Sequence, residues 1–250
     1  MKDMKEEIIY GMNPVSEALR GTRRAFELFV AGSATDRRLE KLLKLAAEKG
    51  VPVRNRDKAD LSRLCATEHH QGVALRVEGF TYAELEDILE RCRASEEQGL
   101  LLVLDGVQDP HNLGAIIRSA ACAGAHGVII PKDRAARITP TVEKSSAGAV
   151  ETVAVAQVVN IAQTLEELKK EGFWIYGAAD SAPAALFGQA FTGPVVLVIG
   201  SEGEGIRPLV RKKCDALFSI PMRGGVSSLN ASVAAGVALF EVVRQRMEKM

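Results

Sequence analysis

The sequence predicts an α/β protein with a parallel sheet in its C-terminal part and a smaller α/β domain before it. Short apolar runs alternate with stretches whose apolar residues recur at helical spacing, which is typical of strands alternating with helices. The run at residues 100–104 is continuous, and such a strand is usually buried on both faces of a parallel sheet. Hydrophobic residues make up 47% of the 250 residues, which is enough to form a core.

The first 78 residues are expected to form the smaller domain. Asn13 and Pro14 predict an N-cap followed by a proline at the first helical position. Gly50 predicts the end of a second helix, which we expect to be capped by Thr35 or Asp36. The predicted strands are residues 8–11, 26–30, 51–53 and 72–77, and the predicted helices are 15–20, 35–49 and 58–65.

An acidic stretch follows this domain. In residues 79–98 acidic side chains clearly outnumber basic ones, whereas the flanking segments carry a slight basic excess. We therefore expect a first domain at residues 1–78, a partly helical acidic linker at 79–98 and a second domain at 99–250.

The second domain is expected to alternate strands and helices throughout. After the first apolar run, Asp109, Pro110 and Asn112 supply residues typical of a turn and a helix start. Strands that alternate with helices favour a parallel sheet covered on both faces. The predicted strands are 100–104, 128–130, 152–157, 174–178, 195–199 and 217–220, and the predicted helices are 113–124, 140–146, 161–170, 209–214 and 229–247.

Composition excludes several classes of protein. Lys plus Arg and Asp plus Glu are 32 each, so bulk charge cannot hold a nucleic acid and any such contact must come from a local patch. The four cysteines form no C-x-x-C pair, which argues against a zinc site and a disulfide framework. We also find no apolar leader and no run long enough to span a membrane. We expect a cytoplasmic protein without a metal or a membrane partner.

Glycines follow the predicted strand at 195–199. Gly200, Gly203 and Gly205 have the spacing G-x-x-G-x-G, which is neither the dinucleotide-binding nor the P-loop pattern. Glycines at the end of such a strand let backbone groups approach a ligand closely. A tight structural turn explains them equally simply, so the pattern alone leaves both interpretations open.

Two further stretches follow strands. Ser228 and Asn230 stand at the start of the last predicted helix, where they either cap the helix or bind polar ligand atoms. Arg118 interrupts an otherwise apolar or small helix face between Ile117 and Ser119. Its guanidinium either lies on the surface over apolar area or grips a phosphate through two hydrogen bonds.

Together, these stretches resemble the SpoU, or TrmH, branch of the SPOUT RNA 2′-O-methyltransferases. The matching motifs are NLGAIIR at residues 112–118, IGSEGEG at 199–205, and IPM with SSLNASVA at 220–222 and 227–234. The first domain resembles the substrate-binding domain of the large-subunit rRNA guanosine 2′-O-methyltransferases of the RlmB type. The motifs that match there are YGMNPVSEAL at residues 10–19 and HQGV at 70–73.

This resemblance implies a fold and partners. The C-terminal domain would be a parallel-sheet SPOUT methyltransferase domain with a trefoil knot. The N-terminal domain would be a ribosomal-protein-like unit that binds the RNA substrate. The methyl donor would be S-adenosyl-L-methionine, the substrate a guanosine ribose in 23S rRNA, and the active site would form at a homodimer interface with residues from both chains.

The resemblance also implies roles for individual residues. Those expected to line the adenosyl pocket are Gly200, Ile220 and Leu229, and those expected to be catalytic or to position the substrate are Asn112, Arg118, Glu202, Ser228 and Asn230.

The family assigns the role of base to the arginine at position 118. An arginine pKa above about 12 suits that role poorly. We therefore hypothesise that Arg118 holds the phosphate of the target and stabilises the developing alkoxide.

Two basic clusters in the first domain could contact RNA phosphates. One is Arg20, Arg23 and Arg24, and the other is Arg54, Arg56 and Lys58. A short run of charges is more often simply a solvated surface, and that alternative stays open.

Other functions remain possible at this point. The same chemistry on a tRNA guanosine or an rRNA adenosine is one, and a non-catalytic RNA-binding factor of ribosome assembly is another. A nicotinamide oxidoreductase is disfavoured because the dinucleotide fingerprint is missing.

Overall fold

The chain divides into two compact units. The computed structural model describes residues 6–31, 37–225 and 228–248. By its contacts, one unit contains Met1–Thr81 together with Ile138–Thr152, and the other contains Tyr82–Arg137 together with Val153–Met250. The division differs from the expected boundaries, because the segment Ile138–Thr152 was expected in the second domain and makes its contacts in the first unit.

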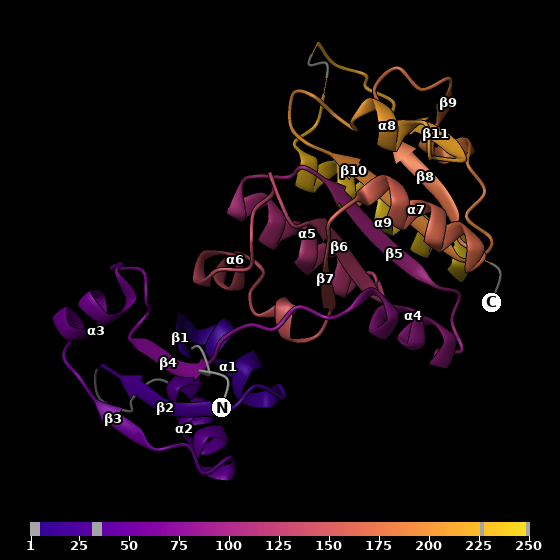
Figure 1. The fold of residues 1–250 in the computed structure, drawn as a ribbon. Helices are drawn as coiled ribbons and strands as arrows, with labels where there is room; N and C mark the ends of the chain where they lie inside the picture. Colours follow the sequence, from indigo (N-terminus) through magenta and orange to yellow (C-terminus); the bar gives the residue numbers. More distant parts are fainter. Residues whose placement is uncertain (1–5, 32–36, 226–227, 249–250) are drawn as a thin grey trace. The chain divides into compact units, whose positions relative to one another are not determined.

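The first unit is built on a four-stranded sheet with the strand order β1-β4-β2-β3 (Figure 1). Strand β4 pairs antiparallel with β1 and β2, whereas β3 pairs parallel with β2. The strands are β1 (Glu6–Tyr10), β2 (Ala25–Val30), β3 (Val53–Asn55) and β4 (Val73–Glu78), and the helices between them are α1 (Met12–Arg20), α2 (Arg37–Glu48) and α3 (Lys58–Cys65).

Alternate residues of these strands face two different layers. On β4, Val73, Leu75 and Val77 belong to the core that α1 and α2 cover. Ala74 belongs to a second cluster with Leu61 of α3. This is the two-residue period of a strand that is covered on both faces.

Helix α1 is capped differently from the expectation. The N-cap residue is Gly11, with φ 96°, and it supplies no side-chain hydrogen bond. The backbone N–H of Met12 instead donates to Oε1 of Gln71, at 2.9 Å. Asn13 therefore lies inside the helix. The two N-terminal motifs meet here, because Gln71 of the motif at 70–73 accepts a hydrogen bond from the first turn of the helix in the motif at 10–19. The expected caps of α2, Thr35 and Asp36, lie outside the described residues.

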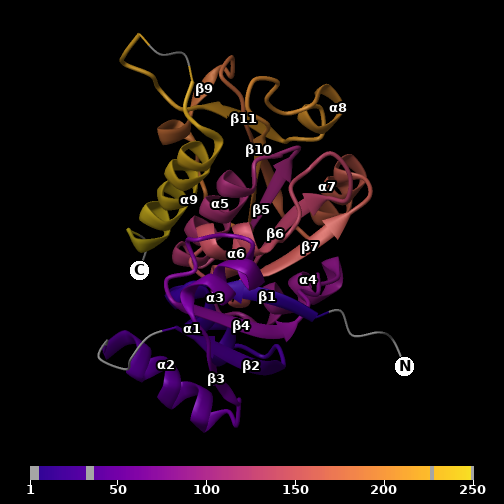
Figure 2. The same ribbon diagram turned by 90° about the vertical axis from the view of Figure 1, so that its left-hand side faces the viewer.

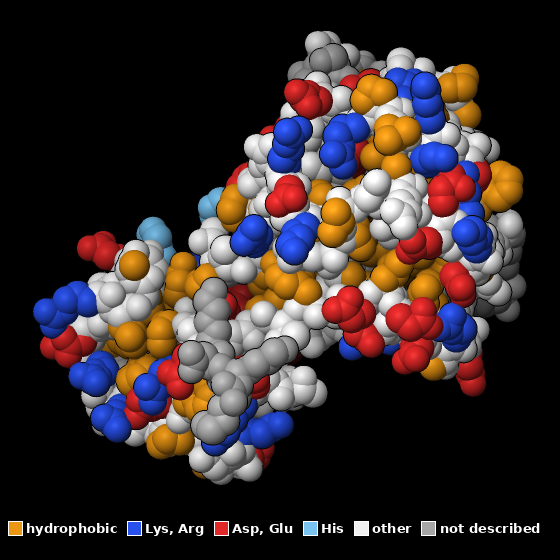
Figure 3. All heavy atoms as spheres, viewed as in Figure 1, with side chains coloured by type: hydrophobic (Ala, Val, Ile, Leu, Met, Phe, Trp, Pro, Cys, Tyr) orange, Lys and Arg blue, Asp and Glu red, His pale blue; other side chains and the backbone are white. Residues whose placement is uncertain are grey.

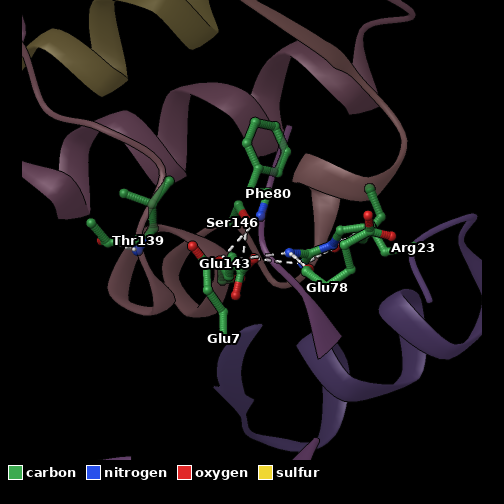
Figure 4. Close-up of polar contacts among 9 residues, drawn as sticks. Glu7, Arg23, Glu78, Phe80, Thr139, Glu143 and Ser146 are labelled. Carbon is green, nitrogen blue, oxygen red and sulfur yellow. Dashed lines mark hydrogen bonds and ion pairs between the residues drawn. The ribbon is translucent and has the colours of Figure 1, made fainter. Parts of the chain in front are cut away.

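A buried ion cluster holds the segment Ile138–Thr152 within the first unit. This segment forms α6 (Pro140–Ser145) and a 3-10 turn, η1 (Ala149–Glu151). Figure 4 shows the guanidinium of Arg23 directed at Glu143, which lies 2.6 Å from its Nη2. The same guanidinium also pairs with Glu151 and donates to the carbonyl of Glu78 at 3.3 Å. The Arg23 side chain is only 11% exposed and that of Glu143 only 2%.

The second unit contains a seven-stranded sheet of order β7-β6-β5-β10-β8-β11-β9, in which every pairing is parallel. The predicted parallel sheet is thereby confirmed. The strands are β5 (Leu100–Asp105), β6 (Gly127–Pro131), β7 (Ala154–Val158), β8 (Trp174–Ala178), β9 (Ala184–Ala185), β10 (Val195–Gly200) and β11 (Ala216–Ser219).

Helices cover both faces of this sheet. Helices α5 and α9 lie together on one side, and α4, α7 and α8 lie on the other (Figure 2). Within the expected linker, α4 carries Ile88 and Leu89, which are buried in the core of this unit. The helices are α4 (Leu85–Ala94), α5 (Pro110–Cys122), α7 (Ile161–Lys170), α8 (Pro208–Arg211) and α9 (Ala231–Met247), and a 3-10 turn, η2, spans Leu186–Gly188.

The central strands β5 and β10 are buried along their whole length. Their register sets Gly200, the last residue of β10, beside Asp105, the last residue of β5. The chain that follows each strand therefore starts from the same edge of the sheet, and that edge carries the polar motifs. In the described part of the chain, no helix has the length and apolar character needed to cross a bilayer.

Candidate active site

A pocket of about 600 Å³ opens at the carboxyl ends of the central strands. Such edges are where open α/β sheets bind ligands, and the volume suits a molecule of cofactor size. Of the residues singled out in the sequence, the pocket is lined by Gly200, Glu202, Gly203, Gly205, Ile220, Ser228, Leu229 and Asn230.

Gly200 is required by the loop that follows it. A Cβ atom at this position would lie 2.0 Å from the carbonyl carbon of Gly205. The loop returns this closely because Ser201 and Gly205 exchange two backbone hydrogen bonds, of 3.0 and 3.1 Å. Gly203 and Gly205 both have positive φ, which favours glycine. The glycine spacing therefore builds a tight loop whose backbone forms one wall of the pocket.

Three polar side chains from the three motifs meet beside this loop. The Nδ2 amide of Asn112 donates to Oε1 of Glu202 at 2.7 Å. The Nδ2 amide of Asn230 donates to the same oxygen at 2.7 Å and to Oδ1 of Asn112 at 3.0 Å. We call Asn112, Glu202 and Asn230 the amide–carboxylate triangle. It joins residues up to 118 positions apart in the chain.

The triangle leaves specific groups free for chemistry. Both amides hold Oε1 of Glu202, and among the described residues nothing donates to its Oε2. Asn230 also caps α9, because its Oδ1 accepts from the backbone N–H of Ser232 at 2.8 Å. That bond fixes which way the amide points. The neighbouring Ser228 is exposed beside the pocket, and Ser227 lies outside the described residues.

Arg118 does not join this group within one chain. It lies on α5 six positions after Asn112, which at about 100° per residue places it on another side of the helix. Its side chain is exposed and makes no hydrogen bond or ion pair with the described residues.

Two residues that support the site, Asp105 and Arg207, were not among the expected site residues. Asp105 is 1% exposed and accepts hydrogen bonds from Arg207, which follows the glycine loop. The available signal was a carboxylate at the end of a continuous apolar strand. Asp109 does act locally, because its side chain caps α5 by accepting from the N–H of His111 at 2.9 Å.

None of the four cysteines lines this pocket. Burial raises the pKa of the Cys65 and Cys92 thiols to about 11 and that of the Cys214 thiol to about 12. These three thiols are therefore protonated near neutral pH and are poor nucleophiles. Among the described residues, no group of three or more His, Cys, Asp or Glu side chains is placed to hold a metal ion.

The expected RNA-binding clusters are largely engaged within the protein. Arg23 is buried in its ion cluster, so its expected place on the surface is wrong, because Glu143 and Glu151 draw the guanidinium inward. Arg54 pairs with Glu27, and Arg56 lies over the ring of Phe29. In the view of Figure 3, Lys and Arg side chains are interspersed with Asp and Glu, without a continuous basic patch.

Comparison with known proteins gives matches over both units. The SpoU rRNA Methylase family matches residues 99–240. The family described as RNA 2'-O ribose methyltransferase substrate binding matches residues 8–83.

Similar curated proteins are matched over nearly the whole chain. The 23S rRNA (guanosine-2'-O-)-methyltransferase RlmB of Ralstonia nicotianae is 47% identical over 244 residues, covering 97% of each chain. The putative TrmH family tRNA/rRNA methyltransferase YacO of Bacillus subtilis is 42% identical, again over 97% of each.

Among solved structures, the SpoU methyltransferase AviRb of Streptomyces viridochromogenes, in complex with the cofactor AdoMet, aligns with a TM-score of 0.81 at 28% identity. The alignment covers 97% of this chain and 91% of that one.

Proposed function

Because the chain belongs to the SpoU rRNA methylase family, we propose that the pocket of the second unit holds S-adenosylmethionine and that the amide–carboxylate triangle positions a ribose for methylation. The resemblance seen in the sequence is thereby confirmed at the level of the family. The protein is an S-adenosylmethionine-dependent RNA 2′-O-ribose methyltransferase. Its substrate is a guanosine of 23S rRNA, in line with the RlmB relatives.

The pocket fits the methyl donor by shape and by chemistry. Its volume of about 600 Å³ is adequate for an adenosyl group with its amino-acid tail. Gly200 lets the loop fold back tightly, and Gly203 and Gly205 of that loop line the pocket without a side chain between their backbone and the ligand. We assign Gly200, Ile220 and Leu229 to the adenosyl group, because all three line this pocket. The bound donor supplies an activated methyl group on a sulfonium.

The residues of this chain then have to align and deprotonate the ribose hydroxyl. Alignment alone can lower a barrier by about 7–11 kcal/mol. In our proposal Asn112 and Asn230 orient Glu202 through Oε1, so that its unengaged Oε2 accepts the proton that the ribose 2′-hydroxyl loses as its oxygen takes the methyl group. Ser228 lies on the same wall and adds a hydroxyl donor. The triangle is the single observation that carries this assignment.

Arg118 completes the site from a second copy of the chain. We propose a homodimer in which Arg118 of one chain holds the target phosphate at the pocket of the other. Two observations support this: the guanidinium is exposed without a partner among the described residues, and α9 exposes Val233, Phe240 and Met247 at intervals of seven. An apolar stripe with that spacing is typical of a helix that packs against another helix.

The fold carries two further expectations. Strand β10 lies between β5 and β8, and α9 returns to pack against α5. This arrangement is compatible with the trefoil knot that the family implies, and we include the knot in the proposal. We also place the enzyme in the cytoplasm, in the company of its rRNA substrate.

Methyl transfer from labelled S-adenosylmethionine to total RNA, with mapping of the modified ribose, tests the proposed function. We expect label in 23S rRNA, at the 2′-oxygen of one guanosine. Label confined to tRNA would overturn the choice of substrate. Binding of the donor without any transfer would favour a non-catalytic RNA-binding factor.

A mixing experiment tests the shared site. An Arg118→Ala variant and a Glu202→Ala variant are each expected to be inactive alone. Unfolded together and refolded, they should recover about a quarter of the wild-type activity, because a quarter of the sites in a random mixture of dimers combines both intact residues. No recovery would show that Arg118 and Glu202 must come from the same chain.

A further inference from the structure

A buried carboxylate lies directly beneath the site without belonging to it. Asp105 ends β5, and its side chain is fully buried at 0% exposure. A buried charge is costly unless it is paired and hydrogen-bonded. This one is satisfied at both of its oxygens by a single residue, Arg207.

The contact between the two residues uses three donors. The backbone N–H of Arg207 donates to Oδ2 of Asp105 at 2.8 Å. The Nε and Nη2 groups of the Arg207 side chain lie 2.7 and 2.6 Å from Oδ1. The bond therefore fixes both the main chain and the side chain of Arg207, and charge-assisted bonds of this kind are stronger than neutral ones.

The contact fixes the loop that carries Glu202. Gly200 is aligned with Asp105 at the end of β10, and Ser201 and Gly205 close the loop between them. Ile206 is buried in the core, and Arg207 comes next. The loop therefore leaves the sheet beside Asp105 and returns to Asp105 seven residues after Gly200. Only its tip, with Glu202, reaches out to the other two members of the triangle.

Asp105 also begins the path to Asn112. After Gly106, with φ 87°, the chain runs to the cap residue Asp109 and into α5. One carboxylate therefore stands at the common base of the two segments that supply Asn112 and Glu202.

We propose that Asp105 and Arg207 are positioning residues for methyl transfer, which hold the Glu202 loop at the distance from Asn112 that the triangle requires. This inference rests on the proposed function and extends it to residues that touch neither the donor nor the ribose. We call the contact between Asp105 and Arg207 the clamp. Without it the loop would move, so that Glu202 would lose its alignment although the residues that line the pocket stay the same.

A similar clamp elsewhere in the same unit supplies a matched control. Asp215 accepts from the backbone N–H of Ile175 at 2.8 Å and pairs with Lys169 at 2.7 Å. It joins the first half of β8 to α7, and neither Asp215 nor Lys169 lines the pocket. Lys169→Met therefore removes a cation from a largely buried aspartate without touching the base of the loop.

The experiment compares Arg207→Lys, Arg207→Met and the double variant Asp105→Asn/Arg207→Met with Lys169→Met. For each full-length protein, donor affinity is measured by calorimetry, kcat and KM for RNA by methyl transfer, and stability by thermal unfolding. The double variant removes both charges, so no unpaired charge stays buried, and it should fold with stability close to that of the wild type.

We expect Arg207→Met to lower kcat about tenfold to a hundredfold, the range that loss of charge-assisted hydrogen bonds implies. KM for RNA should change less than about threefold, and Arg207→Lys should rescue kcat in part, because lysine keeps the charge and loses the fork. The double variant should keep its stability and still be slow. Lys169→Met should lower stability and leave kcat near the wild-type value.

Two results would overturn the proposal. One is a double variant that regains wild-type kcat together with its stability, because the clamp would then act only on folding. The other is an equal kcat loss from Arg207→Met in a wild-type and in a Glu202→Gln background, because a residue that acts through Glu202 must lose its effect there. If the wild type itself transfers no methyl group, the proposed function fails. The clamp is then judged by donor affinity, which Arg207→Met should lower because Gly200, Glu202 and Gly205 of the loop line the pocket.

Discussion

Glu202 in the second unit and Glu143 in the first are both held by donors from distant parts of the chain, and the donors differ in kind. Glu202 is exposed, and neutral amides hold one of its oxygens. Glu143 is 1% exposed, and a guanidinium that also serves Glu151 holds it. The amides leave the carboxylate open to a ligand, whereas the guanidinium locks it away. In our proposal, the difference separates a group placed for chemistry from a group placed for architecture.

The ion cluster of the first unit pairs two carboxylates, Glu143 and Glu151, with the single guanidinium of Arg23. Burial raises the pKa of the Glu143 carboxyl to about 7, although Arg23 works in the opposite direction. The second carboxylate on the same guanidinium, Glu151, adds to the rise. One oxygen of Glu143, Oε2, is buried and has no hydrogen-bond partner among the residues that the structure describes. A proton on that oxygen would relieve the excess of negative charge, which one guanidinium cannot balance.

The largest effect that sharpens this comparison is expected from Arg23→Met. The substitution leaves Glu143 and Glu151 buried without their counter-ion, which should lower the free energy of unfolding by about 3–5 kcal/mol. Urea unfolding followed by circular dichroism measures it. Arg93→Met, which removes a guanidinium from exposed pairs with Glu86 and Glu171, is the control and should leave stability close to that of the wild type. Equal losses in the two variants would contradict the distinction.

The next effect concerns chemistry instead of stability. Glu202→Ala removes the carboxylate that the two amides orient, and kcat should fall by about a hundredfold to a thousandfold, the usual range for one preorganised polar group. Because the Glu202 side chain is exposed, the free energy of unfolding should change by no more than about 0.5 kcal/mol. Single-turnover methyl transfer and thermal unfolding of the same sample check both. A loss of stability comparable to that of Arg23→Met would place Glu202 among the architectural groups.

The smallest effect is a dependence on pH. A raised carboxyl pKa means that the folded state holds its proton more tightly than the unfolded state. The contribution of the Glu143 carboxyl to the free energy of unfolding is therefore complete below about pH 4.5, and it is lost as the pH rises towards about 7. Glu143→Gln removes this dependence. Between pH 5 and pH 8 the free energy of unfolding of the variant, relative to that of the wild type, should therefore rise by up to roughly 3 kcal/mol. Unfolding free energies at both pH values test it, and parallel curves would contradict it.

The convergence of the triangle could be predicted, and the ion cluster could not. Asn112 and Gly200 follow apolar runs that read as buried parallel strands, and such strands bring their carboxyl ends to one edge. Arg23 and Glu143 lie 120 positions apart, and neither has a local pattern that announces the other. Pairing of that range depends on how the whole chain folds.

Predictions made from neighbouring residues were wrong where a contact with a distant residue sets the start or the end of a helix. Asn13 and Pro14 have the composition of a helix start, yet Gln71 supplies the bond to the first turn of α1. The segment at residues 209–214 has helical composition, yet α8 ends at Arg211, because Asp215 ties the following chain to β8. In each case the competing contact is non-local and leaves no trace in the neighbouring residues.

The path of the backbone has a practical consequence for dissecting this enzyme. Since Ile138–Thr152 is built into the first unit, the polypeptide passes from one unit to the other at three places: after Thr81, after Arg137 and after Thr152. A truncated protein that starts at Tyr82 would strip α6 of its sheet and leave Glu143 and Glu151 without the guanidinium of Arg23. A minimal catalytic fragment would therefore have to redesign that insertion, and a single proteolytic nick near Thr81 should leave both pieces associated.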